Sequence, residues 1–475
     1  QLATLERQEL FTGMLVFDGL GVFLRTLLLA FLVLFLVLTK LTHLADREDG
    51  QDFFSLVLGA TLGMCLMVSA NHLMTVFLAI EMASVPSYVL AGLVKGRRRA
   101  SEAALKYAVY GAGAAGVMLY GISLLAGLLG TAHLPTIGDR LIAGQGAAGP
   151  GLDSGVLVAL ALAAIMVLVG LAFKLSAVPF HFWAPDVFEG ATAEVGAFLS
   201  VASKAAALGL LIRLVAAAVP NDAPTHLIAV DSVRAQLVAS SSVELSTFAP
   251  HKFLSIALAV IAAVTCTFGN IAAYVQTNIK RMLAYSTIAH AGYLIMPAAA
   301  AAQVGGAGMR DPFAAILIYA AIYLFMNLTA FAIVAFLRNS LGSEEIADYA
   351  GLWRRSPWVV VAMVVTLFSL VGIPPLAGFN AKFVALYALV AAGGPWMIAL
   401  VVVACINTVI SLVYYLRVAK VMIIDTPTDE AETSPAVSTA AASYLLVTTL
   451  PMIILFLFPQ RLFALAQAAT ASLFG

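Results

Sequence analysis

Residues 168–186 read LVGLAFKLSAVPFHFWAPD, and they place a lysine, Lys174, inside an apolar run that Pro179 interrupts. An ionisable side chain at the centre of a bilayer costs at least ~2.5–3.5 kcal/mol, so a residue of this kind in a membrane segment normally marks an ion pathway. The stretch therefore raises two questions. One is whether the chain crosses a membrane, and the other is what the lysine does there.

The composition indicates a polytopic membrane protein. Of the 475 residues, 62% are hydrophobic and only 11% are charged, against roughly 25% charged residues in soluble domains. The formal net charge is zero, which gives no indication of a nucleic-acid partner. Cys65, Cys266 and Cys405 lie in apolar runs without CxxC spacing, so we expect no iron–sulfur, zinc or disulfide site and no cofactor bound by this chain.

A bilayer core about 30 Å thick needs about 20 apolar residues per helix, and windows of that length predict about twelve spans. The predicted spans lie near residues 16–39, 53–70, 71–94, 102–129, 155–180, 190–217, 253–276, 280–300, 313–338, 357–391, 395–419 and 436–458. The fifth should break at Pro179 and the tenth at Pro374 and Pro375. Odd-numbered spans end on a side that holds about twice as many Lys and Arg residues as the other, so that side should be cytoplasmic.

The two broken spans indicate an internal repeat. FKLSAVPF at 173–180 and FSLVGIPP at 368–375 share Phe, Leu and Pro at the same offset. Because they fall in spans five and ten, the second copy must enter the membrane from the opposite side, as in transporters built from inverted repeats. Chance similarity between two proline-broken apolar helices is the alternative.

We therefore predict an all-α polytopic membrane protein with two inverted five-helix repeats, each containing one broken helix. The predicted organisation is an N-terminal segment with the first helix, the first repeat, a polar outer-side loop, the second repeat and a C-terminal helix region, at residues 1–52, 53–217, 218–252, 253–419 and 420–475.

Several ionisable residues lie far inside predicted spans. Lys204 is about 14 Å along a helix from both Glu194 and Arg213, too far for its side chain to reach either surface. A buried lysine suits proton transfer because burial and a nearby carboxylate shift its pKa in opposite directions. The candidate relay residues are Glu81, Lys174, Lys204 and Lys382, with His290 as an accessory group.

Structural alternatives exist for these residues. Glu81 and Lys174 could form a static ion pair that only fixes helix packing. Lys382 could lie close enough to its helix break to be solvated, and His290 could be a hydrogen-bonded packing residue. The sequence GAGAAG at 111–116 matches GxGxxG, but no predicted strand precedes it, so close helix packing is the better interpretation.

Three stretches resemble a known family. AFKLSAVPFHFWAPDVFEGATAEVGAFLSVASK at 172–204, QTNIKRMLAYSTIAHAGYL at 276–294 and SLVGIPPLAGFNAKF at 369–383 are similar to the antiporter-like subunit N family of respiratory complex I, the proton-pumping NADH:quinone oxidoreductase. The resemblance runs from about Phe17 to the last span. Lysine at both 204 and 382, with PDVF from Pro185, favours subunit N over the sister subunit M, which usually has histidine and glutamate there.

The resemblance implies a role for each candidate. Glu81 would be the carboxylate of a Glu–Lys pair, Lys174 its partner on the broken helix, and Lys204 the central relay lysine. Lys382 would lead toward the outer side, and His290 would be an accessory relay residue.

The resemblance also implies partners and a location. NADH, FMN, iron–sulfur clusters and quinone are expected in other subunits, and quinone reduction there would drive proton movement here. The implied partners are subunit M, small subunits of the K, J and A types and the lipid of a bacterial cytoplasmic (inner) membrane. Bacterial members usually have fourteen helices, so we expect two leading helices to be missing before Gln1.

Three other functions compete with a proton-translocating complex I subunit. A cation/proton antiporter subunit of a multisubunit exchanger would have the same fold. A passive spacer in the membrane arm would use the buried charges only for packing. A membrane-embedded enzyme has the least support, because the sequence shows no catalytic triad or phosphate-binding loop.

Overall fold

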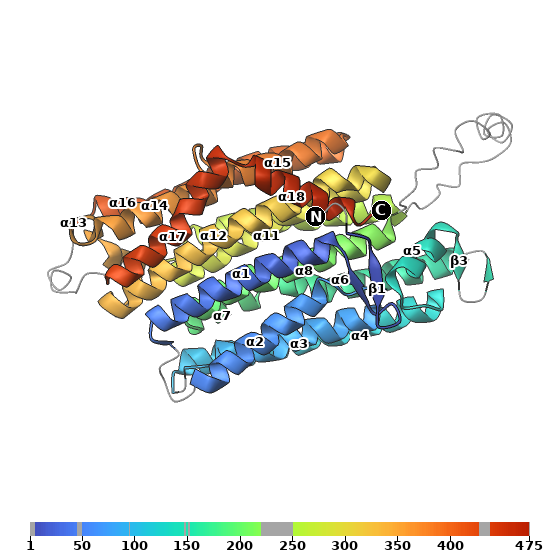
Figure 1. Cartoon of the computed structure of the whole chain (residues 1–475), viewed down its shortest axis with the longest axis horizontal. Coiled ribbons are helices and arrows are strands. Elements are labelled where there is room, and N and C mark those ends of the chain that lie inside the picture. The colour runs from blue at the N-terminus through green and yellow to red at the C-terminus, as the bar shows by residue number, and fades with distance from the viewer. Residues whose placement is uncertain are drawn as a thin grey trace.

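A computed structural model describes residues 5–44, 50–94, 96–146, 149–150, 153–219, 250–426 and 438–474. Long helices lie side by side along one direction (Figure 1). In the same view α5 and the short strands lie toward one end of this bundle, and α13 lies at the other. Most of the predicted outer-side loop, residues 220–249, falls outside the described residues.

The long helices are α1 (Gly19–Leu41), α2 (Gly50–Met67), α3 (Leu73–Ala91), α4 (Arg98–Leu129), α6 (Ser154–Leu175), α8 (Ala193–Ala218), α10 (Pro250–Ala273), α11 (Ile279–Val304), α12 (Arg310–Leu341), α16 (Pro395–Ile423) and α17 (Thr439–Leu457). Shorter helices are α5 (Leu134–Ile142), α7 (Trp183–Gly190), α13 (Leu352–Arg355), α14 (Pro357–Val371), α15 (Ala377–Ala392) and α18 (Gln460–Ala471), with 3-10 turns η3 (Gly306–Met309) and η4 (Ile346–Tyr349). Two small antiparallel pairs join β1 (Gln8–Leu10) to β2 (Leu15–Phe17) and β3 (Gln145–Gly146) to β4 (Gly149–Pro150).

Each predicted span coincides with helix in the structure. Within the described ranges, ten helical segments are long and apolar enough to cross a membrane. The predicted eighth span is α11, which has 26 residues but is not among those ten. The predicted tenth span is divided between α14 and α15, which are shorter apolar helices. The all-α multi-pass fold is thus confirmed.

Both predicted breaks are present. α6 ends at Leu175, where Ser176 takes a left-handed backbone conformation with φ of 57°, and Pro179 follows before α7 begins. α14 ends at Val371, where Gly372 takes φ of 86° as the C-cap, and Pro374 and Pro375 follow before α15 begins. A left-handed residue ends each helix and the prolines prevent its continuation.

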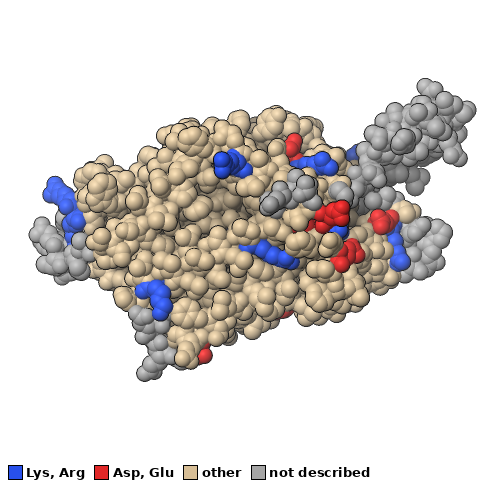
Figure 2. Space-filling model, viewed as in Figure 1, with Lys and Arg blue, Asp and Glu red and all other residues tan. Residues whose placement is uncertain are grey.

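Three helices form the buried centre of the bundle. Nearly every residue of α8, α11 and α12 is buried. In Figure 1, α2, α3 and α4 lie on one side of this centre, and α14, α15, α16 and α17 lie on the other. The outer spans keep apolar faces exposed, and the face in Figure 2 is mostly uncharged, with two isolated basic patches near its middle and the other charges toward its ends. Such a surface suits hydrocarbon or a membrane partner.

A buried ion pair fastens α1 to α8 near the predicted outer side. Asp18 is the N-cap of α1, where its Oδ1 accepts from the Gly21 amide at 2.8 Å. Arg213 donates to both Asp18 carboxylate oxygens at 2.9 Å, and its Nε donates to the Val68 carbonyl at 2.6 Å. Nearby, the Gly19 amide donates to Ser472 Oγ at 2.9 Å, which ties the start of α1 to the end of α18.

Breaking this pair should destabilise the subunit strongly. Asp18→Asn or Arg213→Met leaves one charge buried and uncompensated, a loss of about 3–5 kcal/mol. The double variant should lose much less than the sum of the single changes, because neither charge remains. Thermal unfolding of the purified membrane protein, followed for all four forms, measures this. If the stability lost in the double variant equalled the sum of the losses in the two single variants, the two residues would not be a coupled pair.

Candidate functional site

The structure buries three of the candidate lysines in the bundle. Lys174 is 1% exposed in the last turn of α6, Lys204 is 2% exposed halfway along α8, and Lys382 is 6% exposed near the start of α15. Within the described ranges, no ion pair joins any of these three to a carboxylate. Lys280 provides the contrast, because this buried lysine at the start of α11 pairs with Glu344 at 2.8 Å.

Two of these lysines bond to the ends of the broken helices. Lys204 Nζ donates to the carbonyl of Leu175, the last residue of α6, at 2.6 Å. Lys382 Nζ donates to the carbonyl of Val371, the last residue of α14, at 2.9 Å. The last four carbonyls of a helix have no partner within it, and the negative end of the helix dipole favours a cation. Each break therefore supplies the acceptor for an ammonium group in the interior.

One helix, α11, connects the two lysines. Lys204 Nζ also donates to the Thr287 carbonyl at 3.2 Å, and Lys382 Nζ lies 4.4 Å from the centroid of the Tyr293 ring. His290 lies midway between Thr287 and Tyr293 on α11. Because six residues of helix span about 9 Å, His290 lies between the two places where α11 meets the lysines, close enough to feel both charges.

His290 has a hydroxyl partner on each side of its ring. Its Nδ1 lies 2.9 Å from the Tyr319 hydroxyl of α12, and its Nε2 lies 3.4 Å from the Tyr415 hydroxyl of α16. Tyr415 in turn bonds to Ser286 Oγ. An imidazole with a partner at each nitrogen can take up a proton on one and release it from the other.

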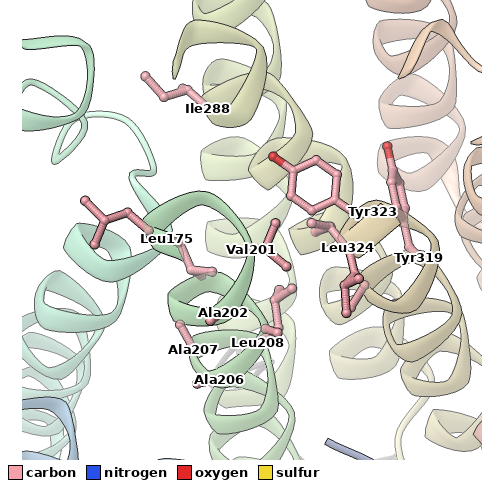
Figure 3. Packing of buried hydrophobic residues seen from close by; sticks show 14 of the residues in the cluster. Leu175, Val201, Ala202, Ala206, Ala207, Leu208, Ile288, Tyr319, Tyr323 and Leu324 are labelled. Carbon is pink, nitrogen blue, oxygen red and sulfur yellow. The ribbon is translucent and has the colours of Figure 1, made fainter. Parts of the chain in front are cut away.

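These tyrosines are functional candidates that the sequence analysis missed. In Figure 3, Tyr319 and Tyr323 project from α12 on one side of α8, and Leu175 lies on the other side. Tyr319 and Tyr323 are four residues apart within an apolar helix. That spacing places both tyrosines on one face of the helix. Two polar rings on one face of an apolar helix were the sequence signal that could have identified them.

Glu81 occupies a different environment from the lysines. It is half-buried on α3, between Leu78 and Met82, which are 59% and 37% exposed. Glu81 lies close enough to Lys174 to act on it electrostatically. Lys174 Nζ nevertheless has no hydrogen-bonding partner among the described residues. The two groups are neighbours without direct contact, so a tight static ion pair is not what holds Lys174.

The described ranges contain no group of three or more His, Cys, Asp or Glu residues that could hold a metal ion. Cys65, Cys266 and Cys405 are free thiols. The sequence GAGAAG at 111–116 lies within α4. A Cβ on Gly111 would meet the Tyr88 hydroxyl at 2.0 Å, so this glycine permits close approach of α3.

The sequence matches the transmembrane family described as NADH:quinone oxidoreductase/Mrp antiporter over residues 70–243 and 237–408. A protein named NADH-quinone oxidoreductase subunit N from Anaeromyxobacter sp. (strain Fw109-5) is 41% identical over 89% of this chain and 78% of its own length.

Two solved structures are similar. A chain of respiratory complex I from Thermus thermophilus, with bound aureothin, matches with a TM-score of 0.72 and 29% identity over 98% of this chain and 88% of that one. A chain of the Mrp complex from Dietzia sp. matches with a TM-score of 0.76 and 20% identity over 97% of this chain and 84% of its own, which shows the fold. The chain belongs to the NADH:quinone oxidoreductase/Mrp antiporter transmembrane family, and within it to the subunit N group.

The position of Lys382 depends on close packing at Gly378. A Cβ there would lie 1.7 Å from the Ser369 carbonyl oxygen, which no side-chain movement can relieve. Gly378→Ala should therefore push α15 away from α14 and separate Lys382 from the Val371 carbonyl. We expect loss of assembled protein or of Lys382-dependent activity.

Gly113→Ala is the matched control, because a Cβ there meets nothing within 4 Å and alanine favours helix by up to about 1 kcal/mol. For both variants, the amount of subunit in isolated membranes and its thermal stability are measured. Equal behaviour of the two variants would show that the contact at Gly378 is not needed.

Proposed function

We propose that this chain is a proton-translocating membrane-arm subunit of an NADH:quinone oxidoreductase and contains no redox centre of its own. The carrying observation is that Lys204 and Lys382 are both buried against α11, each bonded to the last carbonyl of a broken helix, and that His290 lies close enough to both to feel their charges. A structural spacer has no need of two buried ammonium groups, which are costly in a bilayer and which pair with no carboxylate of the described residues.

Each relay lysine alternates between a protonated and a neutral form. In the protonated form the ammonium groups of Lys204 and Lys382 donate to the carbonyl at the end of a broken helix, which stabilises their charge. When the proton leaves, the amine keeps its place and can accept another. Glu81 influences Lys174 electrostatically, so a change at this carboxylate alters how readily Lys174 holds its proton.

Between the lysines, His290 and its tyrosines carry the proton. His290 gains a proton on one ring nitrogen and loses one from the other, while the Tyr319 and Tyr415 hydroxyls can both donate and accept. Glu81 and Lys174 form the first part of the relay, Lys204 the centre and Lys382 the part leading outward. His290 is the accessory group between the last two.

NADH, FMN, iron–sulfur clusters and quinone belong to other subunits of the complex, and quinone reduction there drives the relay. The partners are a second antiporter-like subunit of the M type and small subunits of the K, J and A types. The proposed location is the cytoplasmic (inner) membrane of a bacterium, because the similar protein from Anaeromyxobacter is bacterial. The relatives' names and the complex I structure support this assembly.

Replacing Lys204 tests the relay. Lys204→Met removes the ionisable group, and Lys204→Arg keeps a positive charge that does not deprotonate in proteins. In the intact complex reconstituted into vesicles, we expect NADH-driven proton pumping to fall about a hundredfold or more in both variants, because a positioned proton-transferring group typically contributes at least that much. Quinone reductase activity and subunit content are measured in parallel.

A passive spacer predicts that Lys204→Arg pumps normally in an assembled complex. The cation/proton exchanger, which shares the fold, predicts that the chain purifies without flavin and iron–sulfur subunits. Either result would reject the proposed function.

A further inference from the structure

A charged cavity of about 160 Å³ lies where the predicted cytoplasmic end of α4 meets α7 and α11. Three basic and three acidic side chains line it: Arg99, Lys106, Arg281, Glu102, Asp186 and Glu189. A polar space of this size has room for several water molecules, because one needs only about 10–15 Å³ of such volume.

Ion pairs join the residues that line the cavity. Asp186 accepts from Lys106 Nζ at 2.6 Å and from Arg281 Nη1 at 2.8 Å. Arg281 also contacts Glu189 at 2.8 Å. Burial raises the pKa of Asp186, but the hydrogen bonds and charges of Lys106 and Arg281 outweigh burial and bring this pKa below its ordinary value. The carboxylate therefore stays ionised at neutral pH.

Tyr107 lies directly beneath this cavity. Ala103 lines the cavity, and Tyr107 is one helical turn deeper on the same face of α4. Tyr107 is fully buried, and its hydroxyl has no partner among the described residues. Its ring stacks on that of Trp183, with centroids 4.2 Å apart and planes 8° from parallel.

The same packing brings Tyr107 to the first pair of the relay. Trp183 Nε1 donates to the carbonyl of Phe173, the residue before Lys174, at 3.1 Å. Glu81 acts electrostatically on both Tyr107 and Lys174. Neither the Tyr107 hydroxyl nor Lys174 Nζ has a hydrogen-bonding partner in the part of the chain that the structure describes, and buried polar groups of this kind are where ordered water binds.

We propose that this cavity takes up protons from the cytoplasm and that Tyr107 passes them to the Glu81–Lys174 end of the relay. This inference rests on the proposed function and names the uptake route for it. The hydroxyl oxygen accepts a proton from the cavity side as its own O–H bond breaks on the other side, directly or through water. One proton reaches the neutral Lys174 amine, and Tyr107 is neutral before and after.

Tyr107→Phe tests the route, because it removes only the hydroxyl and keeps the ring stacked on Trp183. The matched control is Tyr349→Phe, which removes another fully buried hydroxyl without a described partner, on η4 and away from this route. In the reconstituted complex we expect Tyr107→Phe to slow proton pumping by at least about fivefold. Tyr349→Phe should pump at the normal rate.

Lys174→Met separates this inference from the proposed function. If Tyr107→Phe pumps normally and Lys174→Met does not, the uptake route is wrong and the relay stands. If both pump normally, the route and the proposed function both fail.

A second variant decides the matter if Tyr107→Phe does not assemble. Glu102→Lys changes an exposed carboxylate that lines the cavity and pairs with Lys106 at 2.8 Å, and because exposed pairs of this kind contribute at most about 1 kcal/mol, the subunit should still fold. The added positive charge repels protons, and we expect slower pumping when the pH on the NADH side is raised, with recovery at high salt because exposed charges are screened. Pumping unchanged in rate and in salt dependence would overturn the proposal.

Discussion

A buried ammonium group in a membrane protein needs hydrogen-bond acceptors, and the rest of this structure depends on that constraint. The acceptors come from backbone that a continuous helix would have used for itself. Leu175 and Val371 have free carbonyls because α6 and α14 end there, and Lys204 and Lys382 donate to them. A helix break and a buried lysine are thus two parts of one device, which occurs once in each half of the chain.

The buried centre follows from the same constraint. A lysine that bonds to backbone carbonyls must be enclosed on all sides, so α8 carries small and apolar residues around almost its whole circumference. Gly196 and Gly209 lie against Phe331 and Leu24, where a Cβ would come within 2.8 Å and 2.4 Å of their side chains. This close packing limits the space around Lys204, so its hydrogen bonds are held in a fixed geometry.

Much of the fold could be predicted from the sequence, because span length and proline position are local properties. The spans, both breaks and the burial of Lys174, Lys204 and Lys382 all depend on the residues immediately around them. The tyrosines about His290 and the pair of Asp18 with Arg213 could not be predicted in this way. They depend on how each helix is rotated about its axis, and helices that are apolar all round give little signal of that rotation.

The bond between Gly19 and Ser472 joins two residues separated by 453 positions. A membrane protein is inserted as it is synthesised, so α1 enters the bilayer long before α18 leaves the ribosome. Until α18 arrives, the Gly19 amide lacks this partner. α18 therefore completes the packing around the start of α1, and this contact forms only once the chain has been translated through residue 472.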